Sequence, residues 1–523
     1  MVVNVCIIIA FCLIFIWTVL DNRQRKSDNR PPGPLKFPFI GNLLFMLPAV
    51  LDFSKLKSIF KMDPEFSEKY LTYKPAYIVF HELSSKYGHL TSLQFGVNSA
   101  VVVSSSKYAK EVFCREEFAN RFADGWFLER QFGKPLGLIF NNGKCYRSLK
   151  MFTMKHLKDF GLGRKENMEI AVEDELMNFL HEFQNKIQNE GTLVEIHHTF
   201  TLPVLNVIWL MVGGIRFSYN DKKMHRLITI VEEISRTHDL GGNILMAFPN
   251  LRFIAPELTG HNHQMRLYDE LKQFFWELLN ERMQEEHDDY VGPRDFVDVF
   301  VSEIKKQKDL PSPDKLFTEE QFVIVCMDLF TAGSETTANT LEFALLYVML
   351  NLRVQNRVQE EIDDIIGQSR LPSMQDRQRM PYTNATLLEA QRMCNVIPLV
   401  HRVATKDTML GPYKVLKDEV LVINLHTIHK DNKVWEDPLV FRPERFLDEN
   451  GNFINLEFLL PFGMGKRVCM GEVLAKHTLF TYFTSILQRY SFQVPAGLAV
   501  PKLKNIKGFT NAPEPFTALV TPR

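Results

Sequence analysis

The chain has 523 residues, of which 46% are hydrophobic, and its formal net charge is -1, with 61 Lys and Arg against 62 Asp and Glu. Such a near-neutral charge excludes the basic footprint of a nucleic-acid-binding protein. The seven cysteines are odd in number and form no C-x-x-C pair, which argues against a disulfide framework and against a closed four-ligand zinc site. A single cysteine is still available as a lone metal ligand or nucleophile.

The first twenty residues predict a membrane anchor. The run "VVNVCIIIAFCLIFIWTVL" contains only Asn4 and Thr18 as polar side chains, and about 20 apolar residues span a bilayer as a helix. Basic residues come afterwards, in "DNRQRK", which places that flank in the cytosol. A cleaved signal peptide would carry its positive charge first. We therefore predict a signal anchor over residues 1–20, in preference to a cleaved signal or a docked core helix.

A basic and proline-rich segment over residues 21–42 follows the predicted anchor. Pro31, Pro32 and Pro34 prevent a helix from continuing and stiffen the chain. The segment is either a rigid hinge that holds a globular body beside the membrane or a plain linker. Both interpretations separate the anchor from the rest of the chain, residues 43–523.

The body is predicted to be one mainly helical α+β domain. The runs "HLTSLQFG" and "SAVVVSS" predict early strands, helical periodicity dominates from about residue 165 to 390, and short strands return after residue 400. One long helix is predicted to begin at Thr318, because Gln321 three residues later completes a capping pattern. Its apolar pattern runs to about Leu350, long enough to cross a domain through its centre.

The middle of this long helix, "AGSETTANT", is polar between apolar flanks. Gly333 costs about 1 kcal/mol relative to alanine inside a helix, and a buried Glu335 is costly unless it is paired or used. The stretch is either the solvated face of an amphipathic helix or a functional site. In a site, Gly333 would let another group approach the helix axis, and Glu335 beside Thr336 would form a proton relay.

Two further charged patterns follow. Glu389 and Arg392 in "LLEAQR" lie three residues apart, on one helix face, and can form an ion pair. This signal is weak alone, because "EEISR" repeats it at Glu233 and Arg236. The stretch "FRPERF" then adds Arg445.

The stretch "PFGMGKRVCMGE" stands directly before a helix-like run. It is no Walker A phosphate loop, because Leu460 stands where that motif needs glycine and Arg467 where it needs Ser or Thr. A dinucleotide-binding G-x-G-x-x-G is also missing. Cys469 lies where a helix N-terminus would stabilise a thiolate. It is a candidate nucleophile or metal ligand.

Taken together, these patterns resemble the cytochrome P-450 superfamily. The spacing of Phe462, Gly465, Arg467, Cys469 and Gly471 resembles its haem-binding loop. The resemblance implies that Cys469 is the proximal thiolate on the iron of haem b, an electron-donating ligand that favours O–O cleavage. Phe462 would shield the sulfur, Gly465 would allow the turn, Gly471 would let the backbone approach the haem, and Arg467 would pair a propionate.

The other patterns resemble two further motifs of the same family. Glu389 and Arg392, with Arg445, resemble its structural Glu-Arg-Arg triad, which would lock the chain beneath the haem without acting in catalysis. "AGSETT" resembles its oxygen-activating motif, in which Glu335 and Thr336 would deliver protons on the distal side of the haem. Family members that rearrange peroxides without a reductant often lack this pair, so its presence favours a monooxygenase.

Additional propionate contacts are expected from the same resemblance. The family usually has Trp-x-x-x-Arg where "NNGKCYRSLKMF" supplies Tyr146 and Lys150. Both can face the haem edge at this i, i+4 spacing, although lysine lacks the bidentate fork of arginine. Lys134 and His401 fall where many members place further contacts, but each is equally well explained as an ordinary polar residue.

The resemblance implies a cytochrome P-450 fold, mainly α, with a long central helix and small β-sheets, preceded by one N-terminal transmembrane helix. It also implies a monooxygenase that inserts one oxygen atom from O2 into a small apolar substrate, such as a steroid, fatty acid or xenobiotic. Since the chain lacks a flavin or nicotinamide fingerprint, electrons would come from NADPH through a separate cytochrome P-450 reductase. Basic residues would form the docking face for this partner: Lys155, Lys158, Arg164, Lys165 and Lys476.

The remaining partners and the alternatives follow from the same resemblance. Cytochrome b5 is a further candidate partner, and membrane lipid is expected at a single-pass anchor in the endoplasmic reticulum, with the catalytic domain on the cytosolic face. Two other functions stay open: a haem-thiolate isomerase or dehydratase that works without a reductase, and a haem sensor without turnover. NADPH-independent turnover would favour the isomerase, and the unusual Tyr146 and Lys150 keep the sensor open.

Overall fold

The computed structural model describes most of the chain after the predicted anchor. The described residues are 28–37, 40–42, 46, 74–96, 98–123, 125–163, 165–237, 244–285, 292–311, 315–506 and 508–523. The predicted anchor, residues 1–20, lies outside them. Within the described part, no helix combines the length and the apolar character needed to cross a bilayer.

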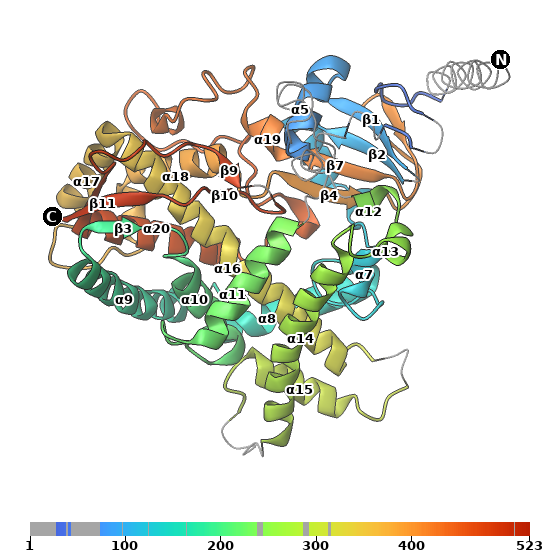
Figure 1. The fold of residues 1–523 in the computed structure, drawn as a ribbon, viewed down its shortest axis with the longest axis horizontal. Helices are drawn as coiled ribbons and strands as arrows, with labels where there is room; N and C mark the ends of the chain where they lie inside the picture. Colours follow the sequence, from blue (N-terminus) through green and yellow to red (C-terminus); the bar gives the residue numbers. More distant parts are fainter. Residues whose placement is uncertain are drawn as a thin grey trace.

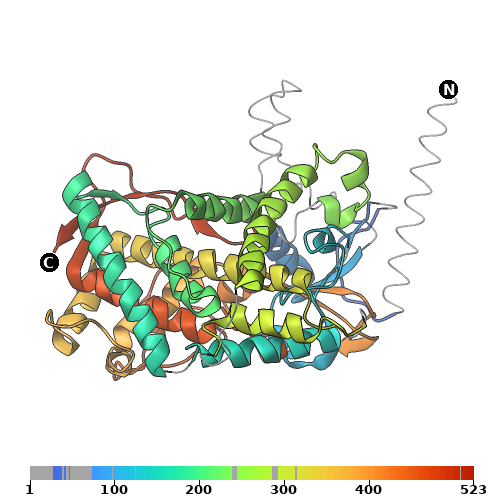
Figure 2. The same ribbon diagram turned by 90° about the horizontal axis from the view of Figure 1, so that it is seen from below.

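One long helix, α16 (Glu319–Leu350), passes through the middle of the molecule (Figures 1 and 2). Its first turn is capped by Thr318, whose hydroxyl accepts a hydrogen bond from the backbone N–H of Gln321 at 3.1 Å. This confirms the predicted start and end of the helix. Most residues of α16 are buried, including Ser334, Glu335 and Thr337 in its polar middle, whereas Ala332 is exposed and Thr336 is half-buried. The interpretation as a solvated amphipathic face is therefore wrong for Glu335.

Helices surround α16 on most sides (Figure 1). The helices before it are α5 (Ala76–Tyr87), α6 (Ser106–Cys114), α7 (Trp126–Glu129), α8 (Gly143–Asp159), α9 (Lys165–Glu190), α10 (Thr201–Gly213), α11 (Lys222–Thr237), α12 (Ile244–Ala247), α13 (Leu251–Ile254), α14 (His261–Gln284) and α15 (Phe296–Lys306). Those after it are α17 (Leu352–Ile365), α18 (Pro381–Cys394), α19 (Leu425–His429) and α20 (Glu472–Arg489). The mainly helical prediction is therefore confirmed.

The strands form small sheets at two sides of the helical body (Figure 1). The four-stranded sheet has the order β1 (Leu90–Phe95), β2 (Asn98–Val103), β7 (Val420–Asn424) and β4 (Leu399–Val403), in which only β2 and β7 are parallel. The second sheet has the order β3 (Leu193–Glu195), β11 (Thr517–Pro522) and β8 (Tyr490–Gln493). Two hairpins remain, β5 (Thr408–Leu410) with β6 (Tyr413–Val415), and β9 (Asn505–Ile506) with β10 (Ala512–Pro513).

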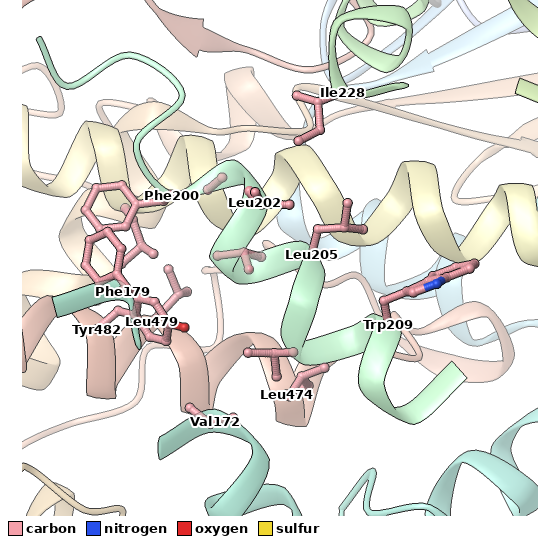
Figure 3. Close-up of a cluster of buried hydrophobic side chains, with 14 of the residues drawn as sticks. Val172, Phe179, Phe200, Leu202, Leu205, Trp209, Ile228, Leu474, Leu479 and Tyr482 are labelled. Carbon is pink, nitrogen blue, oxygen red and sulfur yellow. The ribbon is translucent and has the colours of Figure 1, made fainter. Parts of the chain in front are cut away.

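Helix α10 anchors the core because its sequence, "TLPVLNVIWLMVG", is apolar apart from Thr201 and Asn206, and both of these are buried as well. Its Leu205 and Trp209 project toward α16, and Leu474 of α20 contributes to the same cluster (Figure 3). The Trp209 ring lies 5.5 Å from the ring of Phe330 on α16. Each fully buried large apolar side chain contributes about 1.5–3 kcal/mol. This packing fixes α16 and α20, the two helices that carry the candidate site.

The proline-rich segment packs against the four-stranded sheet in its described part. The backbone N–H of Ser92 on β1 donates to the carbonyl of Pro32 at 2.8 Å, and a Cβ added at Gly33 would lie 2.0 Å from the carbonyl oxygen of Ser92. The Arg30 guanidinium also pairs with the buried carboxylate of Glu419. These contacts favour the interpretation of this segment as a rigid hinge.

Candidate functional site

The loop before α20 is shaped by its glycines. Gly463 and Gly465 have φ of 67° and 69°, in the left-handed region that favours glycine. The loop closes where the backbone N–H of Cys469 donates to the carbonyl of Phe462 at 3.0 Å. Cys469 is thereby held three residues before Glu472, the first residue of α20.

The Cys469 thiol faces open space although protein surrounds it. Its side chain is exposed, yet burial by the neighbouring protein raises the pKa of the thiol, and a hydrogen bond from the backbone of Gly471 works in the opposite direction. The sulfur is therefore accessible to a ligand, although the surrounding protein shields it in part. It is also stabilised as a thiolate by an N–H group of the helix start.

Gly465 and Gly471 differ in what surrounds them. A Cβ at Gly465 would lie 2.2 Å from the backbone oxygen of Phe113, whereas a Cβ at Gly471 would meet no atom within 4 Å. Gly471 also has an ordinary φ of -88°. The fold itself therefore requires glycine at 465, while glycine at 471 leaves an open space beside Cys469.

This difference predicts opposite behaviour of two alanine variants. We expect Gly465→Ala to destabilise the protein without haem by roughly 1–3 kcal/mol, from backbone strain alone. Gly471→Ala should leave that stability within about 0.5 kcal/mol but lower haem incorporation. Urea unfolding of the haem-free proteins and the haem content per chain measure the two effects. Full haem content in Gly471→Ala would show that the open space is not where haem lies.

A buried cationic cluster lies near this loop. It consists of Arg121, His401, Arg402 and Arg467, with Tyr146 among them; the Cζ atom of Arg467 lies 3.2 Å from the centre of the Tyr146 ring. Burial lowers the pKa of Arg467 to about 10 and that of His401 to about 4, and Arg121 further lowers both. Burial, with repulsion from Arg121 and Arg467, also lowers the pKa of Arg402.

Within the part of the chain that the structure describes, no carboxylate forms an ion pair with Arg121, Arg402 or Arg467. Nη1 of Arg467, Nε of Arg121 and Nε2 of His401 are buried without a hydrogen-bond partner. Asp328 acts on Arg121 at longer range, but it is held by Arg130 at 2.5 Å.

Buried cations without partners are costly, so this cluster calls for an anionic ligand. The other nitrogens of Arg467 donate to neutral acceptors, the backbone oxygens of Ala119 (2.9 Å) and Asn141 (2.6 Å) and Oδ1 of Asn142 (2.9 Å). The propionates of a haem are anions of the required kind. The residues present therefore fit the cofactor that the sequence pattern implies.

The structure brings together some of the predicted propionate contacts and separates one. Tyr146 and Lys150 share a face of α8, as their spacing predicts, with the Lys150 ammonium 5.9 Å from the Tyr146 ring. Lys150 also donates to the backbone oxygen of Lys466 at 2.6 Å, which ties α8 to the cysteine loop. Lys134, by contrast, is exposed and pairs with Glu320 at the start of α16, at 2.5 Å. None of its described contacts reaches the cluster.

Two arginines of the cluster, Arg121 and Arg402, were missed by the sequence patterns. Arg402 directly follows His401 on β4, and alternation along a strand predicts that only one of two neighbours faces a given site. His401 and Arg402 are nevertheless both buried. Arg121 lies in an irregular stretch with no periodicity to read. The one sequence signal that could have identified Arg402 is the presence of an arginine in the apolar run "VIPLVHRV".

The middle of α16 has two different faces. A Cβ at Gly333 would lie 3.1 Å from a side-chain carbon of Ile208, so this glycine allows α10 to pack closely. Ala332 is exposed and Thr336 stands one turn later, with its hydroxyl donating to the Ala332 carbonyl at 2.9 Å. In this structure, the group that approaches the helix at Gly333 is therefore Ile208.

Glu335 is buried and held by partners from distant parts of the chain. The Thr510 hydroxyl donates to its Oε2 at 2.6 Å, and Nη2 of Arg236 lies 3.5 Å from its Oε1. Burial raises the pKa of Glu335, against the opposing effects of Arg236, Thr510 and Ser235. A carboxyl with a raised pKa and hydrogen-bonding neighbours is suited to holding and releasing a proton.

The predicted triad is assembled where Arg445 meets Glu389 and Arg392 of α18. Arg392 makes a bidentate pair with Glu389, at 2.7 and 2.8 Å, and Nε of Arg445 lies 3.0 Å from the same carboxylate. Arg392 also donates to the backbone oxygens of His429 and Pro438, both at 2.8 Å. The network ties α18 to the chain that leads toward the cysteine loop.

The chain belongs to the cytochrome P450 family, because the family model "Cytochrome P450" matches residues 68–520. As a member, it is an oxidoreductase of monooxygenase type with a haem iron cofactor. It is 33% identical to a farnesoate epoxidase of Bombyx mori, over 99% of this chain and 98% of that protein. It is 34% identical to cytochrome P450 2J5 of Mus musculus (97% and 94%) and to cytochrome P450 2D4 of Rattus norvegicus (98% and 97%).

Proposed function

We propose that this protein inserts one oxygen atom from O2 into a small apolar organic substrate, at a haem b held by Cys469, with electrons from NADPH delivered by a separate cytochrome P-450 reductase. The observation that carries the proposal is the conjunction of an accessible cysteine at the start of α20 and a buried cationic cluster that has no paired carboxylate among the described residues. Substrates of the steroid, fatty-acid and xenobiotic classes fit this description.

The bound haem supplies the oxygen-activating chemistry, and the chain supplies its ligand and its surroundings. Cys469 would donate the thiolate, stabilised by the helix start and by the Gly471 N–H. Arg467, with Tyr146 stacked on it, would bind a propionate through its free Nη1. Phe462 would shield the sulfur, under the ammonium of Lys476, which lies 5.4 Å from its ring.

Arg121, His401 and Arg402 would complete the binding of the propionates, together with Lys150. The unpartnered nitrogens of Arg121 and His401 support this role. Gly465 would shape the loop and Gly471 would leave room for the porphyrin. Lys134 was included in the propionate set by resemblance, and its pairing with Glu320 makes it the weakest member.

Glu335 and Thr336 would move protons toward the reacting oxygen. Thr336 presents its hydroxyl on the exposed side of α16, held by the Ala332 carbonyl, and keeps its lone pairs free to accept a hydrogen bond. Glu335 would hold a proton behind it, because burial raises its pKa. The triad of Glu389, Arg392 and Arg445 would act on stability alone.

We expect Thr336→Ala to uncouple NADPH consumption from product formation, because the hydroxyl that orders proton transfer is lost. General acid–base groups contribute about 10²–10⁴-fold to rates, so product per NADPH should fall severalfold or more. Thr336→Ser keeps the hydroxyl and is the matched control. NADPH oxidation, peroxide release and product are measured together. If Thr336→Ala couples as well as wild type, the relay is wrong.

The partners and location follow as further proposals. Residues 1–20 would form the anchor, 21–42 the linker and 43–523 the catalytic domain, placed on the cytosolic face of the endoplasmic reticulum membrane, as in microsomal members of the family. Lipid contact outside the anchor is supported by three exposed apolar side chains on and after α13: Phe253 (69% exposed), Ile254 (77%) and Leu258 (90%).

The reductase, with cytochrome b5 as a second electron donor, would dock on the basic side of α8. Lys155 and Lys158 are exposed there, and the contact of Lys150 with Lys466 joins this helix to the cysteine loop. Lys476 is partly neutralised by Glu472 at 2.6 Å. Arg164 lies outside the described residues, as does the side chain of Lys165.

The decisive experiment is turnover under ¹⁸O2 with the reductase and NADPH. Farnesoate is the first substrate to test, because the Bombyx mori relative is named as its epoxidase, and epoxidation adds one oxygen atom to an apolar chain. We expect one labelled oxygen atom per product molecule, in farnesoate or in a compound from a panel of apolar substrates. Product without NADPH would instead identify an isomerase or dehydratase, and binding without turnover across the panel would identify a sensor.

A further inference from the structure

Outside the haem site, two histidines and a glutamate meet where the segment after β3 packs against α11. Nε2 of His198 lies 3.0 Å from Oε2 of Glu232, and Nε2 of His197 lies 3.8 Å from Oε1 of the same carboxylate. Three ligand atoms of these residues lie within 4.8 Å of one another. Across the described residues, no other group of three or more His, Cys, Asp or Glu side chains is arranged in this way.

The backbone brings the two neighbouring histidines to one side of the chain. Adjacent residues of an extended segment point in opposite directions, but His198 has a φ of 58°, an uncommon value for a residue other than glycine. As a result, the two imidazole rings lie with centres 3.7 Å apart and planes at 42°. Unusual backbone conformations of this kind cluster at functional sites.

We propose that His197, His198 and Glu232 form a binding site for a divalent transition metal, with zinc as the best match. Two imidazole nitrogens and one carboxylate oxygen are a known three-ligand set for zinc that leaves a fourth position for water. Tetrahedral zinc with bonds of about 2.0–2.1 Å holds its ligands about 3.3 Å apart. The 3.0 and 3.8 Å distances reach the two different oxygens of Glu232, and one ligand atom from each residue lies within 4.8 Å of the others. Small side-chain rotations would therefore bring the three ligands to the zinc spacing. The side chains are 18%, 43% and 22% exposed, so the ion can enter from solvent.

A buried carboxylate behind His197 supports the assignment. Nδ1 of His197 is buried and has no hydrogen-bond partner, and it faces Oε2 of Glu342 at 3.9 Å. Histidines that bind a metal through one nitrogen commonly donate the other N–H to a carboxylate. A small rotation of His197 toward the metal would leave Glu342, 1% exposed on α16, as its outer partner.

Metal binding here would act on Glu335 through Arg236, a consequence that rests on the proposed function. Nε of Arg236 lies 4.0 Å from Oε1 of Glu232, and its Nη2 lies 3.5 Å from Oε1 of Glu335. A metal ion bound to the Glu232 carboxylate would neutralise its charge. Glu335 would then be the remaining carboxylate partner of Arg236. The ion pair with Glu335 would then tighten, and proton transfer from that carboxyl would slow.

Calorimetry with zinc chloride tests the site. The protein is tag-free and haem-loaded, and it is treated with a chelator before the titration. We expect one zinc ion per chain. Loss of an outer partner alone weakens metal binding about 10–100-fold, so His198→Ala, which removes a ligand, should weaken it by at least about 100-fold. His263→Ala is the matched control, because His263 pairs with Glu233 at 3.5 Å without a second histidine, and it should bind zinc like wild type.

X-ray absorption of the zinc-loaded protein should show nitrogen and oxygen ligands at about 2.0–2.2 Å. Equal zinc affinity of wild type and His198→Ala, or no zinc bound by wild type, would overturn the site; the melting temperature of each variant verifies its folding.

Zinc should also slow turnover of wild type but not of His198→Ala. Zinc binding with unchanged turnover would overturn only the link to Glu335, and absence of turnover without zinc would count against the proposed function instead.

Discussion

Cys469→Ala should lose monooxygenase turnover completely, down to the level given by free haem. In the proposed function, Cys469 supplies the thiolate ligand of the haem iron at the start of α20, and the electron donation of a thiolate favours O–O cleavage. The cationic cluster around Arg467 remains intact in this variant, so some haem should still bind. Product formation with reductase and NADPH, normalised to bound haem, measures the effect.

A second exposed cysteine provides the control for this variant. Cys114, at the end of α6, is also a free and exposed thiol, but it lies outside the loop that contains Cys469. We expect Cys114→Ala to retain wild-type turnover. Retained turnover per bound haem in Cys469→Ala, or equal losses in both variants, would contradict the assignment of Cys469.

Arg392→Ala should destabilise the protein by about 3–5 kcal/mol, the cost of leaving a buried charge without its partner. Glu389 and Arg392 are both 0% exposed in their side chains and are joined by a bidentate pair. Removal of Arg392 leaves Glu389 with Arg445 as its remaining cation, at 3.0 Å. It also frees the backbone oxygens of His429 and Pro438. Urea unfolding followed by circular dichroism measures the loss.

Arg442→Ala is the matched control for the triad. The Arg442 guanidinium pairs with the exposed Glu436 at 3.2 Å, a kind of surface pair that contributes about 0–1 kcal/mol. Its backbone N–H, which donates to Glu389 at 2.9 Å, is kept in the variant. If Arg392→Ala is no more destabilising than Arg442→Ala, the triad is not the lock that its geometry indicates.

Much of the fold could be predicted because local sequence signals and burial agree. The cap at Thr318, the strands β1 and β2, and the pair of Glu389 with Arg392 all depend on residues close in sequence. The loop around Cys469 was predictable for the same reason, since its glycines and cysteine lie within a few residues.

The distant partners could not be predicted. Arg236 was noted only as part of a common i, i+3 pattern, but it lies between Glu232, one turn earlier on α11, and Glu335, which lies far away in the sequence on α16. Gly333 was predicted to let another group approach the helix axis, and the sequence did not reveal that this group is Ile208 of α10. Such contacts depend on how helices pack, and neither periodicity nor motif spacing encodes that directly.

The propionate contacts show the same limit. Arg121 and Arg402 join Arg467 through the meeting of a loop, a strand and the cysteine loop, which no single stretch of sequence reveals. Lys134 was assigned by position in a resembling motif, yet its ion pair is with Glu320, 186 residues away. A family resemblance predicts the role of a residue well when its motif forms one compact loop. It predicts the role poorly when the residue's contact partner comes from another helix or strand.

The absorption spectrum of the reduced, carbon-monoxide-bound protein tests the central claim most directly. It reports the atom bound to the haem iron opposite the carbon monoxide, independently of substrate and reductase. We expect a strongly red-shifted Soret band in wild type and in Cys114→Ala, and its loss in Cys469→Ala. A folded, haem-loaded wild-type protein without that band would contradict thiolate ligation by Cys469 and, with it, the proposed function.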